Sequence, residues 1–97
     1  MISLEFEGFD WDEANKAKIL KRFELHIVEE FFNQDLFIIA DKQHSLNEER
    51  FIEIGEGPLS KPMFVCFTMR SSRIRVISAR FMKEKEATKY EEFKKSI

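Results

Sequence analysis

The sequence is poor in residues on which many functional sites depend, with one cysteine, two histidines and three glycines. A single cysteine, Cys66, cannot form an internal disulfide, and a zinc cluster is not expected. Cys66 lies in the apolar run at residues 63–67, where burial of the thiol is the usual outcome. So few glycines argue against a phosphate-cradling loop, and the motifs CxxC, HExxH and GxSxG are absent.

Long apolar runs are missing as well. No stretch approaches the roughly 20 apolar residues of a membrane span, and the first residues show no basic-then-apolar signal pattern. A cytoplasmic protein with no membrane partner is therefore expected. The 97 residues suit one domain, residues 1–97, and 43% hydrophobic with 35% charged residues is typical of a folded chain. Eleven phenylalanines predict a core filled mainly by aromatic rings.

Basic residues are slightly fewer than acidic residues overall, 16 against 18, and most of them lie in the last third of the chain. The net charge of −2 argues against an obligate nucleic-acid binder. However, residues 1–68 hold 7 basic and 14 acidic residues (−7), whereas residues 69–97 hold 9 and 4 (+5). Because salt limits electrostatic attraction to about 8–10 Å, a local basic surface can bind phosphates on an acidic protein. A charged strand beside a solvated helix produces the same asymmetry without any ligand.

Hydrophobic periodicity predicts an α+β domain with the order β-α-α-β-β-β-β-α. Strands are predicted at residues 4–9, 36–40, 50–55, 63–69 and 73–81, with the fourth covered on both faces. Helices are predicted at residues 12–23, around 27–32 and at 83–95, the first capped by Asp10 or Asp12. A loop is expected at 41–47. Short turns at 55–58 and 71–72 imply a small antiparallel meander with the helices packed on one face.

The residues that could carry chemistry gather in the predicted loop and the last strands. They are His44, Glu48, Glu49, Arg50, Thr68, Arg70, Arg73, Arg75, Ser78 and Arg80. RNA cleavage without a metal needs a base for the 2′-hydroxyl, a stabiliser of the phosphorane and an acid for the leaving 5′-oxygen. Arginine suits the second role because its planar fork binds phosphate oxygens in pairs. Histidine or glutamate can fill the other two.

Each of these residues also has an ordinary structural explanation. A histidine in a polar loop is usually just exposed, and a glutamate pair beside an arginine is usually a solvated strand entry. Strand arginines often pair with neighbouring acids, at well under ~1 kcal/mol per exposed pair. Alternation places Arg73 and Arg75 on one face of a regular strand and Arg80 on the other. A β-bulge, or a position for Arg80 at the strand end, would be needed to bring them together.

Several segments taken together resemble the BrnT family of toxins. The segment FDWD at residues 9–12, followed by Lys16, is similar to the family's F-x-W-D-x-x-K opening. Residues 41–50 (DKQHSLNEER) resemble its D-x-x-H-S-x-G-E-E-R segment, and an isoleucine–glycine pair follows at 54–55. Residues 67–70 (FTMR) resemble F-T-x-R, and residues 74–80 (IRVISAR) resemble I-R-I-I-S-A-R. Glu86 and Tyr90 match the terminal helix. The order and spacing of these pieces over nearly the whole chain make the match specific.

The resemblance implies a RelE-like fold and a metal-independent endoribonuclease that inhibits translation and growth as the toxin of a bacterial type II toxin–antitoxin system. It implies RNA as substrate and no cofactor or metal. It also implies a BrnA-like ribbon-helix-helix antitoxin that binds the toxin directly and makes the only contact with DNA. The catalytic candidates that it suggests are His44, Glu49, Arg50, Arg70 and Arg80. The RNA-binding candidates are Thr68, Arg73, Arg75 and Tyr90.

The chain departs from the family pattern in two places. Lys-His-Gly usually follows the first helix, and Arg22, Phe23 and Glu24 stand there instead, which removes a histidine and a glycine that tolerates positive φ. Asn47 replaces a further glycine, a milder change because asparagine tolerates left-handed geometry. These changes favour an alternative, in which a catalytically weakened relative acts as a binding subunit or co-repressor with its antitoxin. A purely structural small α+β protein is a third interpretation.

Overall fold

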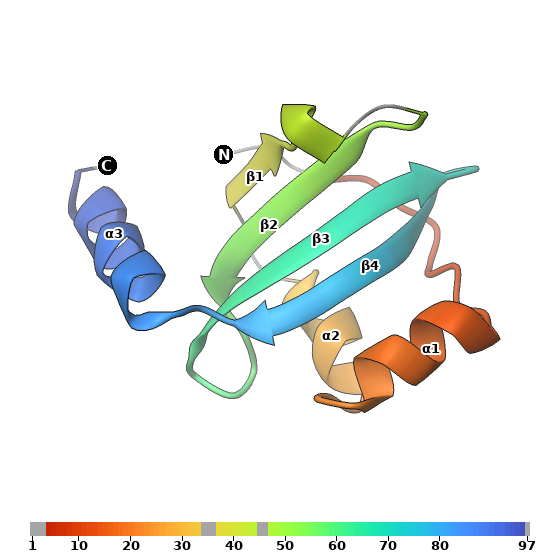
Figure 1. The fold of residues 1–97 in the computed structure, drawn as a ribbon, viewed down its shortest axis with the longest axis horizontal. Helices are drawn as coiled ribbons and strands as arrows, with labels where there is room; N and C mark the ends of the chain where they lie inside the picture. The colour runs from red at the N-terminus through yellow and green to blue at the C-terminus, as the bar shows by residue number, and fades with distance from the viewer. Residues whose placement is uncertain (1–3, 34–36, 45–46, 97) are drawn as a thin grey trace.

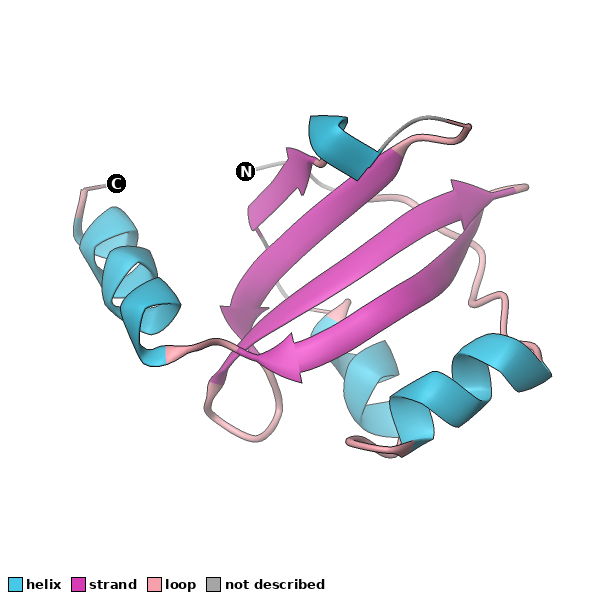
Figure 2. Cartoon of the chain, in the orientation of Figure 1, coloured by secondary structure: helices cyan, strands magenta, loops and turns pink. Residues whose placement is uncertain are grey.

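The computed structural model describes residues 4–33, 37–44 and 47–96 (Figure 1). Within these ranges the chain forms three α-helices, a 3-10 helix and one four-stranded antiparallel sheet, which confirms the α+β class. The elements are α1 (Glu13–Leu20), α2 (Leu25–Phe31), β1 (Phe37–Ala40), η1 (Lys42–His44), β2 (Arg50–Glu56), β3 (Pro62–Arg70), β4 (Arg73–Phe81) and α3 (Glu84–Lys95). Figure 2 shows the sheet as a continuous meander with the helices on either side of it.

The strand predicted at residues 4–9 is wrong. In the described part of this segment, Phe9 makes an isolated parallel bridge to Ile74 of β4. Backbone hydrogen bonds join Glu7 N to Ser72 O and Asp10 N to Ile74 O, both at 2.8 Å. Gly8 interrupts the extended backbone because its φ is +127°, a conformation open to glycine at little cost. The segment therefore follows the edge of β4 without becoming a fifth strand.

The sheet has the order β1-β2-β3-β4, so the predicted antiparallel meander is confirmed. The tight reversal between β3 and β4 is made by Ser71 and Ser72, whose φ values are 50° and 66°. Positive φ at both central residues is the geometry of a two-residue hairpin turn that matches the twist of the strands. The predicted loop at 41–47 contains η1, while residues 45 and 46 and the side chain of His44 lie outside the described part.

Helix α1 lies beside the edge of β4 that pairs with no other strand of the sheet. Asp12 caps it, because its carboxylate accepts from Asn15 N at 3.1 Å and Asn15 Oδ1 accepts from Asp12 N at 2.7 Å. The buried amide of Asn15 also donates to Val76 O at 3.3 Å, on the edge strand. This bond satisfies a carbonyl that an uncovered edge strand would leave to water.

The core lies between the sheet and the pair α1 and α2, and aromatic rings fill much of it, as predicted. Its buried members are Ile19, Phe23, Val28, Phe31, Phe32, Met63, Val65, Phe67, Ile74, Val76 and Ala79. Phe32 stands at its centre, edge-on to Phe67 at 5.2 Å between ring centroids. The prediction that β3 is covered on both faces holds only in part, because Phe64 and Cys66 on its other face are half-buried. Each alternates with a fully buried neighbour on the core face.

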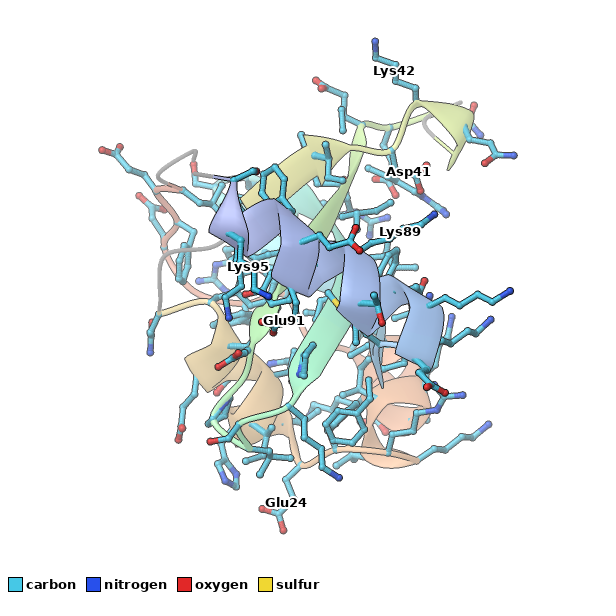
Figure 3. All side chains as sticks on the ribbon, turned by 90° about the vertical axis from the view of Figure 1, so that its left-hand side faces the viewer. Glu24, Asp41, Lys42, Lys89, Glu91 and Lys95 are labelled. Carbon is cyan, nitrogen blue, oxygen red and sulfur yellow. The ribbon has the colours of Figure 1, made fainter. Side chains whose placement is uncertain are left out.

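Helix α3 lies on the opposite face of the sheet, so the prediction that all helices share one face is wrong. We call this the outer face; its residues are Phe37, Ile39, Arg50, Ile52, Ile54, Phe64, Cys66, Thr68, Arg70, Arg73, Arg75, Ser78 and Arg80. Phe37 of β1 packs against Tyr90 and Phe93 of α3, at 6.1 and 4.8 Å between ring centroids. Figure 3 shows α3 in front of the strands, with Lys89, Glu91 and Lys95 along it. The two aromatic residues of α3 require an apolar surface, and the core face is already filled by α1 and α2.

Candidate functional site

A β-bulge in β4 determines which arginines share a face. Cys66 pairs with Ser78 and Phe67 pairs with Val76, so Ile77 is an extra residue in β4. An extra residue reverses the alternation beyond it. Arg75 and Arg80, which alternate in a regular strand, therefore both lie on the outer face, because their register partners Thr68 and Phe64 do. Of the two possibilities that the sequence left open, the structure contains the bulge.

One end of the outer face holds a cleft of about 300 Å³. We call it the cationic cleft; it is lined by Ala14, Asn15, Lys18, Glu48, Arg50, Arg70, Arg75, Val76 and Ile77. Its four cations come from four elements, α1, β2, β3 and β4, and Glu48 is the acid among the lining residues. The exposed Arg73 adjoins it through its register with Arg70. Cations gathered on a concave surface concentrate positive potential there.

Arg75 is held at the wall of the cleft by two acids that precede α1. Its Nη2 lies 2.9 Å from Asp12 Oδ2, its Nη1 lies 3.7 Å from Asp10 Oδ1, and the side chain is only 15% exposed. The pKa of Asp12 is lowered, mainly by the hydrogen bond from the Asn15 backbone N–H and further by Arg75. Asp12 thus caps α1 and orients Arg75 at the same time.

Arg70 is held much more loosely. Its Nε and Nη2 lie 3.4 and 3.5 Å from the carboxylate of Glu48, at the long limit for a hydrogen bond. The Arg70 side chain is 49% exposed. An exposed ion pair of this geometry contributes well under ~1 kcal/mol. A phosphate oxygen can therefore replace Glu48 at Arg70 with little loss of stability.

Thr68 lies beneath the rim of the cleft and does not face solvent. Its hydroxyl donates to Glu49 O at 2.6 Å, and the residue is 2% exposed. This bond ties the segment that enters β2 to β3, and so positions Glu48 and Glu49. The side chain of Glu49 is exposed next to the cleft. The backbone of His44 ends η1, and its side chain lies outside the described residues.

Arg80 and Tyr90 lie at the far end of the outer face. Arg80 makes two hydrogen bonds to Glu86 of α3, at 2.7 and 2.9 Å, and stacks over the Phe64 ring at 4.4 Å. These bonds lower the pKa of Glu86 to about 2 and raise that of Arg80. Tyr90 is 7% exposed, and burial raises its pKa. The strand rises roughly 15 Å from Arg75, in the cationic cleft, to Arg80. The structure therefore leaves Arg80 and Tyr90 outside the cleft.

Two residues of interest escaped sequence reasoning. Lys18 lines the cleft only because α1 lies beside β4. Helical spacing places Lys18 on the same side of α1 as Ala14, but it does not show what that side packs against. Glu53 sits on the core face of β2, fully buried, with neither carboxyl oxygen hydrogen-bonded among the described residues. Burial raises the pKa of Glu53 to about 9, so it carries a proton at neutral pH. The only hint in the sequence was an acid between isoleucines.

The described residues contain no group of three or more histidines, cysteines or acids placed to hold a metal ion. Nor does any helix in the described ranges have the length and apolar character needed to cross a membrane.

Comparison with known families matches residues 11–86 to the model of BrnT, the ribonuclease toxin of type II toxin–antitoxin systems. The matched region runs from Trp11, just before α1, to Glu86 in the first turn of α3, and it contains every residue that lines the cationic cleft. Neither the curated proteins nor the solved structures gave a match. The expected likeness to the RelE fold therefore stays a prediction.

Proposed function

The chain belongs to the BrnT family of ribonuclease toxins from type II toxin–antitoxin systems, and we propose that it binds and cuts RNA in the cationic cleft. One observation carries the proposal: Lys18, Arg50, Arg70 and Arg75 converge from four separate elements around one cleft. Surface charge placed without a function has no reason to gather four cations, each from a different element, around the same cleft. A phosphodiester bound there meets fixed positive charge on several sides.

The two arginines with defined geometry take different parts in the proposed reaction. Arg75 is oriented in advance by Asp12, so it stabilises the charge of the phosphorane with little reorganisation. Arg70 exchanges its loose contact with Glu48 for a phosphate oxygen and binds the substrate. Arg50 and Lys18 extend the positive surface, and the exposed Arg73 contacts the RNA chain beyond the scissile bond.

The proposed base comes from the segment that Thr68 ties down at Glu49 O, and the proposed acid is His44. Glu48 or Glu49 removes the 2′-hydroxyl proton, and the resulting alkoxide attacks the adjacent phosphorus. His44 protonates the 5′-oxygen as the P–O bond breaks, leaving a 2′,3′-cyclic phosphate. Because guanidinium groups supply the positive charge, we propose that no metal or cofactor takes part.

Arg80 and Tyr90, both candidates from the sequence, receive a positioning role in this proposal. Their contacts join α3 to the outer face, through Glu86 for Arg80 and through Phe37 for Tyr90. In the cell the toxin acts in the cytoplasm, where cleavage of RNA stops translation and growth. A ribbon-helix-helix antitoxin of the BrnA kind neutralises it and provides the contact with DNA.

The test is cleavage of a defined RNA in EDTA by the wild type, Arg70→Ala and the control Lys95→Ala. Lys95→Ala removes the same charge from an exposed position on α3 (Figure 3). We expect Arg70→Ala to lower kcat/KM about 100-fold or more, because Arg70 keeps its contact with the phosphate oxygen as negative charge builds up in the phosphorane. Lys95→Ala should cleave at the wild-type rate. Equal rates for all three proteins would contradict an active site in the cationic cleft.

One observation favours the alternative of a binding subunit or co-repressor. Where the family resemblance places a histidine, Phe23 is 6% exposed and packs on Phe81 at 5.1 Å between ring centroids. That position is part of the core and supplies no polar group. Expression without an antitoxin separates the two functions, because the nuclease arrests growth and a binding subunit does not. Growth at the normal rate, together with no cleavage in vitro, would favour the binding subunit.

A further inference from the structure

The outer face carries a second concavity, between α3 and the strands. It measures about 290 Å³, and we call it the α3 groove. Ile39, Ile54 and Phe64 line it from three strands, and Met82, Tyr90 and Phe93 line it from α3 and the linker before it. A cavity of ~150 Å³ holds a benzene ring, so the α3 groove has room for two apolar side chains.

The groove is open to solvent at a cost to the isolated protein. Ile39 is 55% exposed and Phe93 is 45% exposed, although both are large and apolar. An exposed apolar surface of this kind, rimmed by charged residues, is typical of a protein interface. Lys89 lies on the rim and makes no ion pair within the described part of the chain, whereas Glu86 is already engaged by Arg80.

The α3 groove and the cationic cleft lie on the same face of the sheet. Phe64 in the groove and Thr68 beside the cleft are both outer-face residues of β3. Four residues of strand separate them, a distance of roughly 13 Å. Four or five residues of extended chain are enough to span from one to the other.

We propose that the α3 groove is the docking site of the antitoxin, which seats two apolar side chains there and lays acidic residues over the cationic cleft. The inference rests on the proposed function, since it assumes that the cleft is the site that must be blocked. Lys89 on the groove rim, Arg70 in the cationic cleft and Arg73 beside it are all cations, so they favour a partner that carries acidic residues. Apolar anchoring supplies affinity in this arrangement, while the acids exclude RNA by occupying its phosphate site.

The experiment measures, by calorimetry, how tightly the purified 97-residue chain binds a purified ribbon-helix-helix antitoxin of the BrnA kind. Ile39→Glu and Phe93→Glu each place a charge in the groove at a position that is already half exposed, so folding is preserved. We expect each to weaken binding about 30-fold or more, as for an interface hot spot. Leu20→Glu is the matched control, because Leu20 is 56% exposed on α1, away from the groove. It should bind as the wild type does.

A further variant tests the acidic part of the partner. Arg73→Ala should weaken binding several-fold and reduce the dependence of affinity on salt, since one ion pair is lost. Wild-type affinity in both groove variants would overturn the proposal. So would a wild-type toxin that forms dimers which Ile39→Glu converts to monomers, because the groove would then bind a second copy.

These outcomes are independent of the nuclease proposal. Binding is measured without RNA, so loss of affinity in the groove variants supports the docking site even if the purified toxin cleaves nothing. Conversely, EDTA-resistant cleavage that depends on Arg70 supports the nuclease even if the groove variants bind the antitoxin normally.

Discussion

The buried carboxyl group of Glu53 allows a quantitative prediction about stability. The pKa of Glu53 is raised from an ordinary 4.5 to about 9 in the folded chain, because burial disfavours its charged form. The folded chain therefore binds a proton that the unfolded chain has released at neutral pH. The stability that this bound proton contributes is fully present below pH 4.5 and is lost progressively as the pH rises toward 9.

The size of this effect follows from the difference between the two pKa values. Each pH unit between them costs about 1.4 kcal/mol, so the loss at pH 7 is roughly 3 kcal/mol and at pH 8 nearly 5 kcal/mol. A small domain has only about 5–15 kcal/mol of stability in total. Glu53→Gln removes the titration, so it should stabilise the protein at pH 8 while changing it little at pH 4.5. Glu53→Met should stabilise it further, because the amide leaves buried polar atoms unpaired at a cost of about 1–3 kcal/mol.

The assay is urea unfolding of the wild type and Glu53→Gln at pH 5 and pH 8. Between these pH values the wild type should lose about 4 kcal/mol more than the variant does. Glu92→Gln makes the same chemical change at an exposed position on α3 and serves as the control. If the wild type and Glu53→Gln keep the same stability difference at both pH values, Glu53 does not bind its proton in the folded state, and the reasoning from burial fails.

Three further predictions concern side chains that hold the outer face and its turns. Arg80→Ala should lower the free energy of unfolding by roughly 1–2 kcal/mol, because it removes the bonds to Glu86 and both side chains are about one-third exposed. Since the pKa of Glu86 is about 2, the difference from wild type in urea unfolding should persist above pH 4.5 and vanish as the pH falls toward 2. Gly57→Ala should destabilise by roughly 1–3 kcal/mol, because the added methyl group meets Met63 Sδ in the core; thermal unfolding with no fall in the midpoint would show that the core yields. Thr68→Val should cost about 1–2 kcal/mol, because the Glu49 carbonyl loses its hydrogen bond from the Thr68 hydroxyl, and it should slow RNA cleavage. Thr68→Ser should restore both stability and rate; a slow Thr68→Ser enzyme would argue for a role beyond positioning.

Most of the secondary structure could be predicted because local patterns determine it. The alternation of β4 was predicted with its exact bounds, and the paired serines marked the turn that precedes it. Asp12 is the cap of α1 because its carboxylate can reach a backbone N–H three residues on, an arrangement visible in the sequence. The first strand failed for a local reason too, since Gly8 at positive φ interrupts it.

The sequence predicted which residues belong to the candidate site better than it predicted how they are arranged. Arg50, Arg70, Arg73 and Arg75 were named from the sequence, and the structure gathers them at one end of the outer face. Their roles in catalysis stay predictions. Arg80 was placed with them, yet it lies at the other end beneath α3, because strand length separates residues that the family pattern lists together. Lys18 was not assigned to a site, since its place depends on how α1 meets the edge of β4.

By itself the sequence determined the α+β class, the meander, the aromatic core and the supply of cations in the last strands, because periodicity, turn residues and composition are local properties. The tertiary structure decided the rest. The bulge at Ile77 put Arg75 and Arg80 on one face, and the filling of the core face by α1 and α2 sent α3 to the other. The burial of Glu53 likewise depends on neighbours from distant segments. Register, the side of a sheet that a helix covers and the solvation of a carboxyl group are all set by contacts between residues far apart in the chain.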